Sequence, residues 1–228
     1  MLAVFREGQY QTAILDANLV ENVKAIAQMK QELRSFQPDA IFGVERSGPF
    51  IADAAAHGDA ALMGKTVRIK KHDTYAEIVA SLTDQIEAMI RDGKKKFAFT
   101  DVYFSGSTFD KLNKDVLEPL AKRHRDCEFR GFWLRERIGF ERLKPQRVPI
   151  ELGLPDVRQP SDAIPNLVNR PIAVPFAVGD DAAILIEGRA VESVYVYDRD
   201  GVITRMFTPR PGETTRDLVI RLLNEWRQ

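Results

Sequence analysis

The segment from Asp101 to Thr108 places one carboxylate ahead of a short run of glycine and hydroxyl side chains. It reads Asp-Val-Tyr-Phe-Ser-Gly-Ser-Thr and follows an apolar run. Gly106 permits a tight turn, and the small Ser105 and Ser107 let an oxyanion approach backbone amides. A helix that begins near Thr108 would add the favourable potential of its N-terminus. The pattern is typical of an anion-binding loop, although a plain strand-to-helix turn capped by Thr108 fits the same residues.

A second glycine-containing turn lies about 55 residues earlier in the chain. It runs from Gly43 to Phe50 as Gly-Val-Glu-Arg-Ser-Gly-Pro-Phe, between an apolar run and a stretch of small residues. The two glycines have the spacing of a Walker A loop, but Pro49 and Phe50 stand where that loop has Lys and Ser or Thr. The sequence therefore excludes a Walker A loop at this turn.

Apolar patterns around these turns predict the elements that position them. Four short apolar runs predict buried strands, and the stretches between them have the spacing of amphipathic helices. Such alternation predicts an α/β fold with a doubly wound, mainly parallel sheet, in which ligands bind beyond the carboxyl ends of the strands. The predicted strands are 39–44, 66–69, 97–101 and 128–134, and the predicted helices are 18–35, 49–56, 75–93 and 108–124.

The last third of the chain has a different sequence pattern. Seven prolines between Pro145 and Pro175 exclude long helices there and predict an irregular cover. Beyond it, 193–197 and 202–207 predict two strands joined by an Asp200-Gly201 turn, and a final helix is expected from Glu213. We therefore expect an α/β domain over residues 1–150 and a β-rich appendage over residues 151–228.

The first loop resembles the phosphoribosyl-pyrophosphate motif of type I phosphoribosyltransferases. In that motif an apolar strand leads into two acids, two apolar residues, a variable residue and then Thr-Gly-Gly-Thr. Asp101 matches the second acid. The resemblance implies that Asp101 binds ribose hydroxyls and, directly or through water, Mg²⁺. The 5′-phosphate loop is matched by Ser105, Gly106, Ser107 and Thr108.

Two positions depart from the motif. Thr100 replaces the first acid, and Phe104 stands at the variable position, where many members have an acid. An aromatic residue there is similar to the pyrimidine-operon regulators of this family, which are of the uracil phosphoribosyltransferase type. These departures put catalysis in doubt more than they do ligand binding.

The resemblance extends to other segments of residues 35–150. The second turn is similar to the family's pyrophosphate loop, matched by Glu45, Arg46, Ser47 and Gly48. A basic segment with Arg68, Lys70 and Lys71 after the second strand resembles the family's mobile basic loop, although a solvated turn explains it as well. Arg135 and Arg137 follow the fourth strand, where they could contact the base or pyrophosphate or form only a charged strand end.

The composition of the chain limits the kinds of binding partner and the cellular location that we expect. The chain has 33 Lys plus Arg and 33 Asp plus Glu, so no net field favours nucleic acid or a membrane. The single cysteine, Cys127, excludes an intramolecular disulfide framework and a cysteine-built metal site. No signal-peptide pattern begins the chain, and we expect a cytoplasmic protein with a phosphoribosyl or nucleotide ligand; a homodimer remains open.

These features lead to one expected function and two alternatives. The expected function is a phosphoribosyltransferase that uses phosphoribosyl pyrophosphate, Mg²⁺ and a nucleobase-like acceptor. One alternative is a regulator that senses such a ligand without turnover, which the changes at Thr100 and Phe104 favour. The other is an effector or toxin of the same fold, which only the unfamiliar last third suggests.

Overall fold

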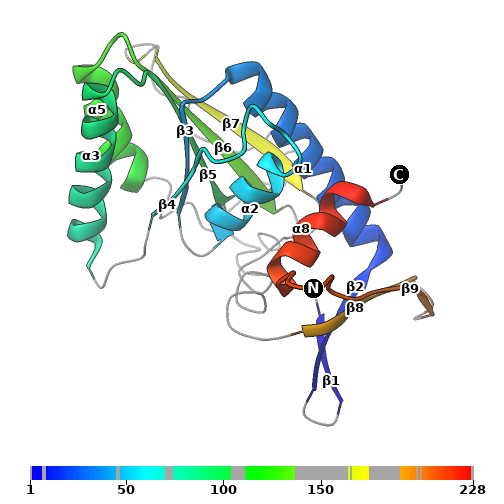
Figure 1. The fold of residues 1–228 in the computed structure, drawn as a ribbon. Coiled ribbons are helices and arrows are strands. Elements are labelled where there is room, and N and C mark those ends of the chain that lie inside the picture. The colour runs from blue at the N-terminus through cyan, green and yellow to red at the C-terminus, as the bar shows by residue number, and fades with distance from the viewer. Residues whose placement is uncertain are drawn as a thin grey trace, which may run out of the picture.

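A computed structural model of the chain shows two β-sheets joined by helices (Figure 1). It describes residues 2–6, 9–44, 47–69, 74–103, 111–136, 164, 166–174, 191–198, 200 and 202–226. The larger sheet has five parallel strands in the order β4-β3-β5-β6-β7, and the smaller has four in the order β1-β2-β8-β9. The predicted α/β fold with a mainly parallel sheet is confirmed.

The first four strands of the large sheet are those that the sequence predicts. They are β3 (Ala40–Val44), β4 (Thr66–Ile69), β5 (Lys96–Tyr103) and β6 (Glu128–Glu136). Side chains alternate between its faces, so Phe42, Phe97 and Phe99 face one helical layer while Ile41 and Ala98 face the other. The sheet is therefore buried on both sides, as a doubly wound fold requires.

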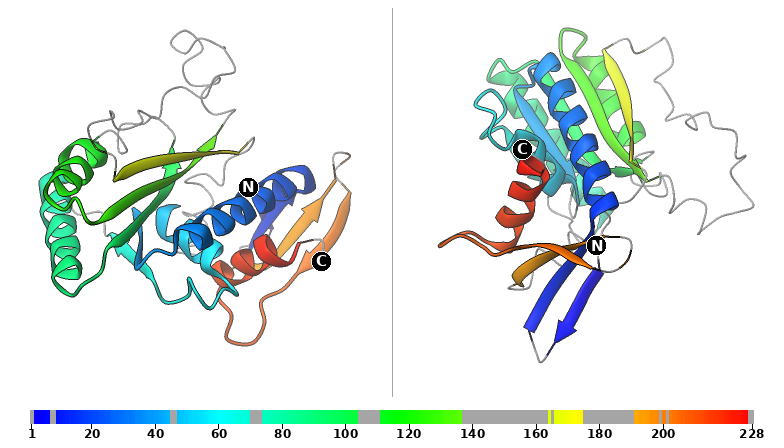
Figure 2. Two further views of the ribbon diagram at one scale, coloured as in Figure 1. Left: turned by 90° about the horizontal axis from the view of Figure 1, so that it is seen from above. Right: turned by 90° about the vertical axis from the view of Figure 1, so that its right-hand side faces the viewer.

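Helices cover both faces of this sheet (Figure 2). One layer contains α1 (Asp16–Phe36), α2 (Ser47–Ala56) and α8 (Thr215–Glu225). The other contains α3 (Tyr75–Arg91), the π-helical turn η1 (Asn113–Leu117) and α5 (Glu118–Arg123). Pro119 lacks the N–H that an α-helix needs for its i−4 bond, and just before it the Glu118 N–H bonds to Asn113 O instead, five residues back.

The fifth strand, β7 (Leu167–Val174), corrects the expectation of an irregular cover up to Pro175. It pairs with β6 at the edge of the sheet and contains Pro171 opposite Trp133. Proline cannot donate to a sheet, but an edge strand has one row of N–H groups that needs no strand partner. A proline therefore does not exclude a strand at this position.

The small sheet joins the two ends of the chain. β1 (Leu2–Arg6) and β2 (Gln9–Leu15) form a hairpin that pairs in parallel with β8 (Val191–Tyr197), which pairs in turn with β9 (Ile203–Phe207). The predicted hairpin β8–β9 is confirmed, whereas β1 and β2 were not predicted. The sheets do not follow a division at residue 150, because β7 completes the large sheet and β1–β2 belong to the small one.

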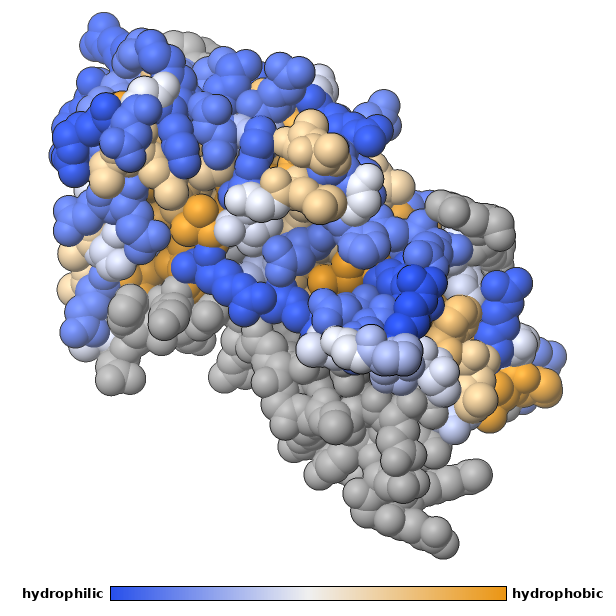
Figure 3. All heavy atoms as spheres, in the orientation of Figure 1, coloured by the Kyte–Doolittle hydropathy of each residue, from blue (hydrophilic) through white to orange (hydrophobic). Residues whose placement is uncertain are grey.

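A single apolar core connects the small sheet to the large one. Val194 and Val196 of β8 are fully buried in the cluster that also contains Leu218 and Leu222 of α8 and Leu33 of α1. By contrast, β9 exposes the large apolar side chains of Ile203 and Met206, and Val202 just before it is exposed as well. Figure 3 shows hydrophobic residues at its lower right, where Figure 1 draws β9. Among the described residues, no helix is both long and apolar enough to cross a membrane.

Candidate functional site at the carboxyl ends of β3 and β5

The strand order creates a switch point between β3 and β5. From β3 the chain passes to β4 on one side, and from there it returns to β5 on the other side of β3. In doubly wound sheets, ligands bind in the crevice at such a reversal, beyond the carboxyl ends of the strands. Both predicted loops begin there, since residues 45–46 follow β3 and residues 104–110 follow β5. The carboxyl ends of β3 and β5 thus lie at the same edge of the sheet, and the course of both loops beyond that edge stays a prediction.

Two glycines bring the first turn of α2 directly onto the sheet. A Cβ atom at Gly43 would lie 2.3 Å from Pro49 N, and one at Gly48 would lie 2.5 Å from Thr100 O. Real Cβ atoms essentially never come so close to backbone, so neither position accepts a side chain without a shift of the chain. The glycines predicted for a tight turn therefore let β3, β5 and α2 meet at backbone contact.

Thr100 stabilises this contact between β5 and α2 from within the core. Its side chain is fully buried, and its hydroxyl donates to Gly48 O at 3.1 Å, with Phe42 O also at 3.4 Å. The side chain thus lies on the α2 face of β5 and points away from solvent. This packing explains why the position holds a hydroxyl, because an ionised carboxylate would face two carbonyl oxygens there.

Asp101 lies on the opposite face of the same strand. It pairs in register with Trp133, whose side chain is buried in the layer of α3, η1 and α5. Asp101 is partly buried and stands at the carboxyl end of β5, as predicted for a ligand-binding carboxylate. The rest of the predicted phosphate loop, Ser105, Gly106, Ser107 and Thr108, lies outside the described residues.

The predicted pyrophosphate loop is described only in its second half. Ser47 is the first residue of α2, and Gly48 follows it at the contact with Thr100. Glu45 and Arg46 lie outside the described residues. The roles of these residues remain predictions.

The basic residues are distributed over two strands. Arg68 belongs to β4 itself rather than to the loop after it, and its Nη2 lies 3.6 Å from Oδ2 of Asp53 in α2. Lys70 and Lys71 lie outside the described residues. Arg135 lies near the carboxyl end of β6, opposite Tyr103 of β5, and Arg137 falls beyond the described part of that strand. Arg68 and Arg135 are thus both at the sheet edge where the loops begin.

One contact beside the site was not anticipated. Lys111 Nζ lies 5.3 Å from the ring centroid of Tyr75, a cation–π contact between the helix after 104–110 and the start of α3. Burial, together with the nearby Asp115 carboxylate, raises the pKa of the Tyr75 hydroxyl to about 12. The contact joins the first residue of α3 to the helix that follows residues 104–110. Spacing alone offers no signal for it, because the two residues are far apart in the chain.

The described residues contain no ready-made group of metal ligands. Within the part of the chain that the structure describes, no group of three or more His, Cys, Asp or Glu could hold a metal ion. A Mg²⁺ ion that arrives with a phosphorylated ligand needs only one or two carboxylates, because phosphate oxygens and water complete its shell. Asp101 fits that mode of binding.

Comparisons with known proteins find a likeness among solved structures. No protein-family model matches the sequence, and no curated protein matches it. Among solved structures, the chain is similar to a purine phosphoribosyltransferase from Pyrococcus horikoshii Ot3, with 17% identity and a TM-score of 0.32. The match covers 56% of this chain and 79% of that one.

Proposed function

We propose that the chain is a phosphoribosyltransferase that moves a 5-phosphoribosyl group between pyrophosphate and a nucleobase-like acceptor. The observation that carries the proposal is that β3 and β5, the strands that precede the two predicted anion loops, are parallel neighbours at one switch point. Both loops start from adjacent parallel strands, and Gly43 and Gly48 pack the first turn of α2 against those strands. A ligand with phosphate at one end and pyrophosphate at the other could contact both loops.

Each predicted residue then has a distinct role. Asp101 would accept hydrogen bonds from the two ribose hydroxyls, and residues 105–108 would hold the 5′-phosphate through backbone amides. Residues 45–48 would hold pyrophosphate, with Arg46 and the basic Arg68, Lys70 and Lys71 supplying charge. A bound Mg²⁺, held by Asp101 and the ligand's own oxygens, would neutralise part of the pyrophosphate charge.

The chemistry requires little from the protein beyond positioning. The bond between ribose C1 and a pyrophosphate oxygen breaks, and its electron pair leaves with pyrophosphate. C1 then bonds to a nitrogen of the acceptor, which loses a proton. Charge builds up on the ribose ring and on the departing pyrophosphate, so oriented amides and arginine side chains lower the barrier.

A second candidate function is a sensor that binds the same ligand without turnover. The observation that favours it is Thr100, which stands at the position of the motif's first acid and is buried with its hydroxyl on Gly48 O, so this position offers the ligand no carboxylate. Asp101 would then hold the ribose with no acidic neighbour on its strand. Binding is retained in this arrangement, while catalysis lacks one carboxylate.

One experiment separates the two functions. The protein is incubated with phosphoribosyl pyrophosphate and Mg²⁺, with and without pooled nucleobases, and both binding and pyrophosphate release are measured. Release that depends on a base supports the enzyme, and binding without release supports the sensor. Absence of binding contradicts both.

A further inference from the structure

Two arginines from distant elements share one carboxylate beside the candidate site. Asp53, in the middle of α2, contacts Arg216 of α8 at 2.5 Å and Arg68 of β4 at 3.6 Å. Arg216 is 13% exposed in its side chain, whereas Arg68 is 53% exposed. The shorter and more buried contact satisfies Asp53, so Arg68 is the weaker and more exposed partner.

The position of Arg68 gives this arrangement a consequence for anion binding. Arg68 pairs in register with Gly43, so its backbone lies one strand spacing, about 5 Å, from the glycine at which the predicted pyrophosphate loop begins. The cluster of Asp53, Arg68 and Arg216 carries a net charge of +1. Because two arginines share one carboxylate, the cluster stays positively charged at the edge of the sheet where we expect an anion to bind.

We propose that Asp53 is a positioning residue that competes with a bound anion for Arg68, and that α8, through Arg216, sets how strongly Asp53 holds Arg68. The inference rests on the proposed function and assigns the last helix a part in it. When Arg216 occupies Asp53, Arg68 can turn toward a bound pyrophosphate group. When α8 is displaced, Asp53 draws Arg68 away from the ligand.

The test measures the affinity for pyrophosphate with Mg²⁺ by calorimetry at about 0.15 M salt, where distant charges are screened. Asp53→Asn frees Arg68 and should tighten binding about two- to fivefold, the range expected for an exposed ion pair. Arg216→Gln should weaken binding by a similar factor, and Arg216→Lys should restore most of it. In an Arg68→Gln background, Asp53→Asn should have no effect.

A matched control removes a negative charge elsewhere. Asp126 pairs with Lys95 at the amino-terminal end of the sheet, so Asp126→Asn should leave pyrophosphate affinity unchanged. Thermal unfolding of each variant checks that α8 stays packed against α2. If Asp53→Asn loosens α8, the comparison of Arg216→Gln with Arg216→Lys serves as the test. The inference is overturned if Asp53→Asn changes pyrophosphate affinity equally with and without Arg68. It is also overturned if wild type binds pyrophosphate and Asp53→Asn leaves that affinity unchanged. A wild type that does not bind pyrophosphate overturns the proposed function as well.

Discussion

Position 100 shows how one residue can serve packing at a place where a ligand contact was expected. The Thr100 hydroxyl donates to Gly48 O, and Gly48 itself has no room for a Cβ. The two residues form one contact between β5 and α2. At the next position, Asp101 faces the opposite side of the sheet, because side chains alternate along a strand. One face of β5 thus serves packing, and the other carries the carboxylate proposed to bind the ligand.

Restoring the missing acid should therefore damage the fold instead of improving the site. Thr100→Asp would bury a carboxylate against two carbonyl oxygens, and we expect it to lower the free energy of unfolding by about 3 kcal/mol or more. Thr100→Ser keeps the hydroxyl and should cost less than about 1.5 kcal/mol. Urea unfolding of both variants checks this. A Thr100→Asp protein as stable as wild type would show that position 100 can open toward the ligand.

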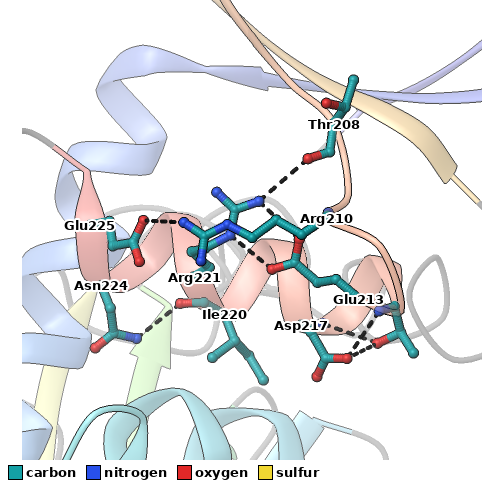
Figure 4. A network of polar contacts seen from close by, with 9 residues as sticks. Thr208, Arg210, Glu213, Asp217, Ile220, Arg221, Asn224 and Glu225 are labelled. Atoms are coloured by element: carbon teal, nitrogen blue, oxygen red, sulfur yellow. Dashed lines mark hydrogen bonds and ion pairs between the residues drawn. The ribbon is translucent and has the colours of Figure 1, made fainter.

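At the scale of elements, α8 is held by a polar clamp at its start (Figure 4). Arg221 donates to both carboxylate oxygens of Glu213, at 2.8 and 2.9 Å, and the Arg210 N–H donates to Glu213 as well. Both side chains of the Glu213–Arg221 pair are only 12% exposed. The clamp fixes the segment between β9 and α8 to the helix, and Arg216 reaches Asp53 from the first turn of α8.

The clamp predicts a dependence of stability on pH. Its hydrogen bonds to Arg221 hold the pKa of Glu213 at about 2, below the ordinary 4.5. A carboxyl with a depressed pKa stabilises the fold above its unfolded pKa, and this contribution is lost as the pH falls from about 4.5 toward 2. Glu213→Gln should cost about 1–2 kcal/mol at pH 7 and reduce the loss of stability over that range.

The control for this prediction is the exposed pair nearby. Glu225 lies 3.8 Å from Arg210 and is 46% exposed, so Glu225→Gln should change stability by less than about 0.5 kcal/mol. Equal effects of the two substitutions at pH 7 would show that Glu213 contributes no more than a surface charge.

Some elements were predictable because their packing follows local patterns. The helix around Leu82 and Ile86 was predicted because its apolar stripe is what the structure buries. β7 was missed because Pro171 argues against a strand unless the strand is known to lie at an edge. The hairpin β1–β2 was also missed, because neither Leu2–Arg6 nor Gln9–Leu15 shows a strict alternation of apolar and polar residues.

Some parts of the candidate site were likewise predictable from local sequence, and others were not. The ends of β3 and β5 were predictable from apolar runs followed by glycine turns, because local sequence determines both. The pairing of Asp53 with Arg216, or of Tyr75 with Lys111, depends on which elements become neighbours. Such contacts join residues up to 163 positions apart, and no local spacing encodes them.

For the whole molecule, the sheets and the shared core imply one cooperative unit instead of two domains. α8 packs against α1 and α2, and buried Val194 and Val196 of β8 belong to the same core. We expect a single thermal unfolding transition for the full chain. A fragment of residues 1–150 should show none, because it lacks β7, β8 and α8. A fragment that unfolds cooperatively would contradict a shared core.

The measurement that tests the central claim most directly compares the affinity of wild type and Asp101→Asn for phosphoribosyl pyrophosphate with Mg²⁺. The substitution keeps the size of the side chain but leaves one acceptor oxygen for two ribose hydroxyls. Charge-assisted hydrogen bonds are worth about 1.5–3 kcal/mol, so we predict an affinity loss of about 10- to 100-fold with an unchanged melting temperature. Normal binding by the mutant, or a loss that comes only from unfolding, would contradict a ribose-phosphate site at the ends of β3 and β5.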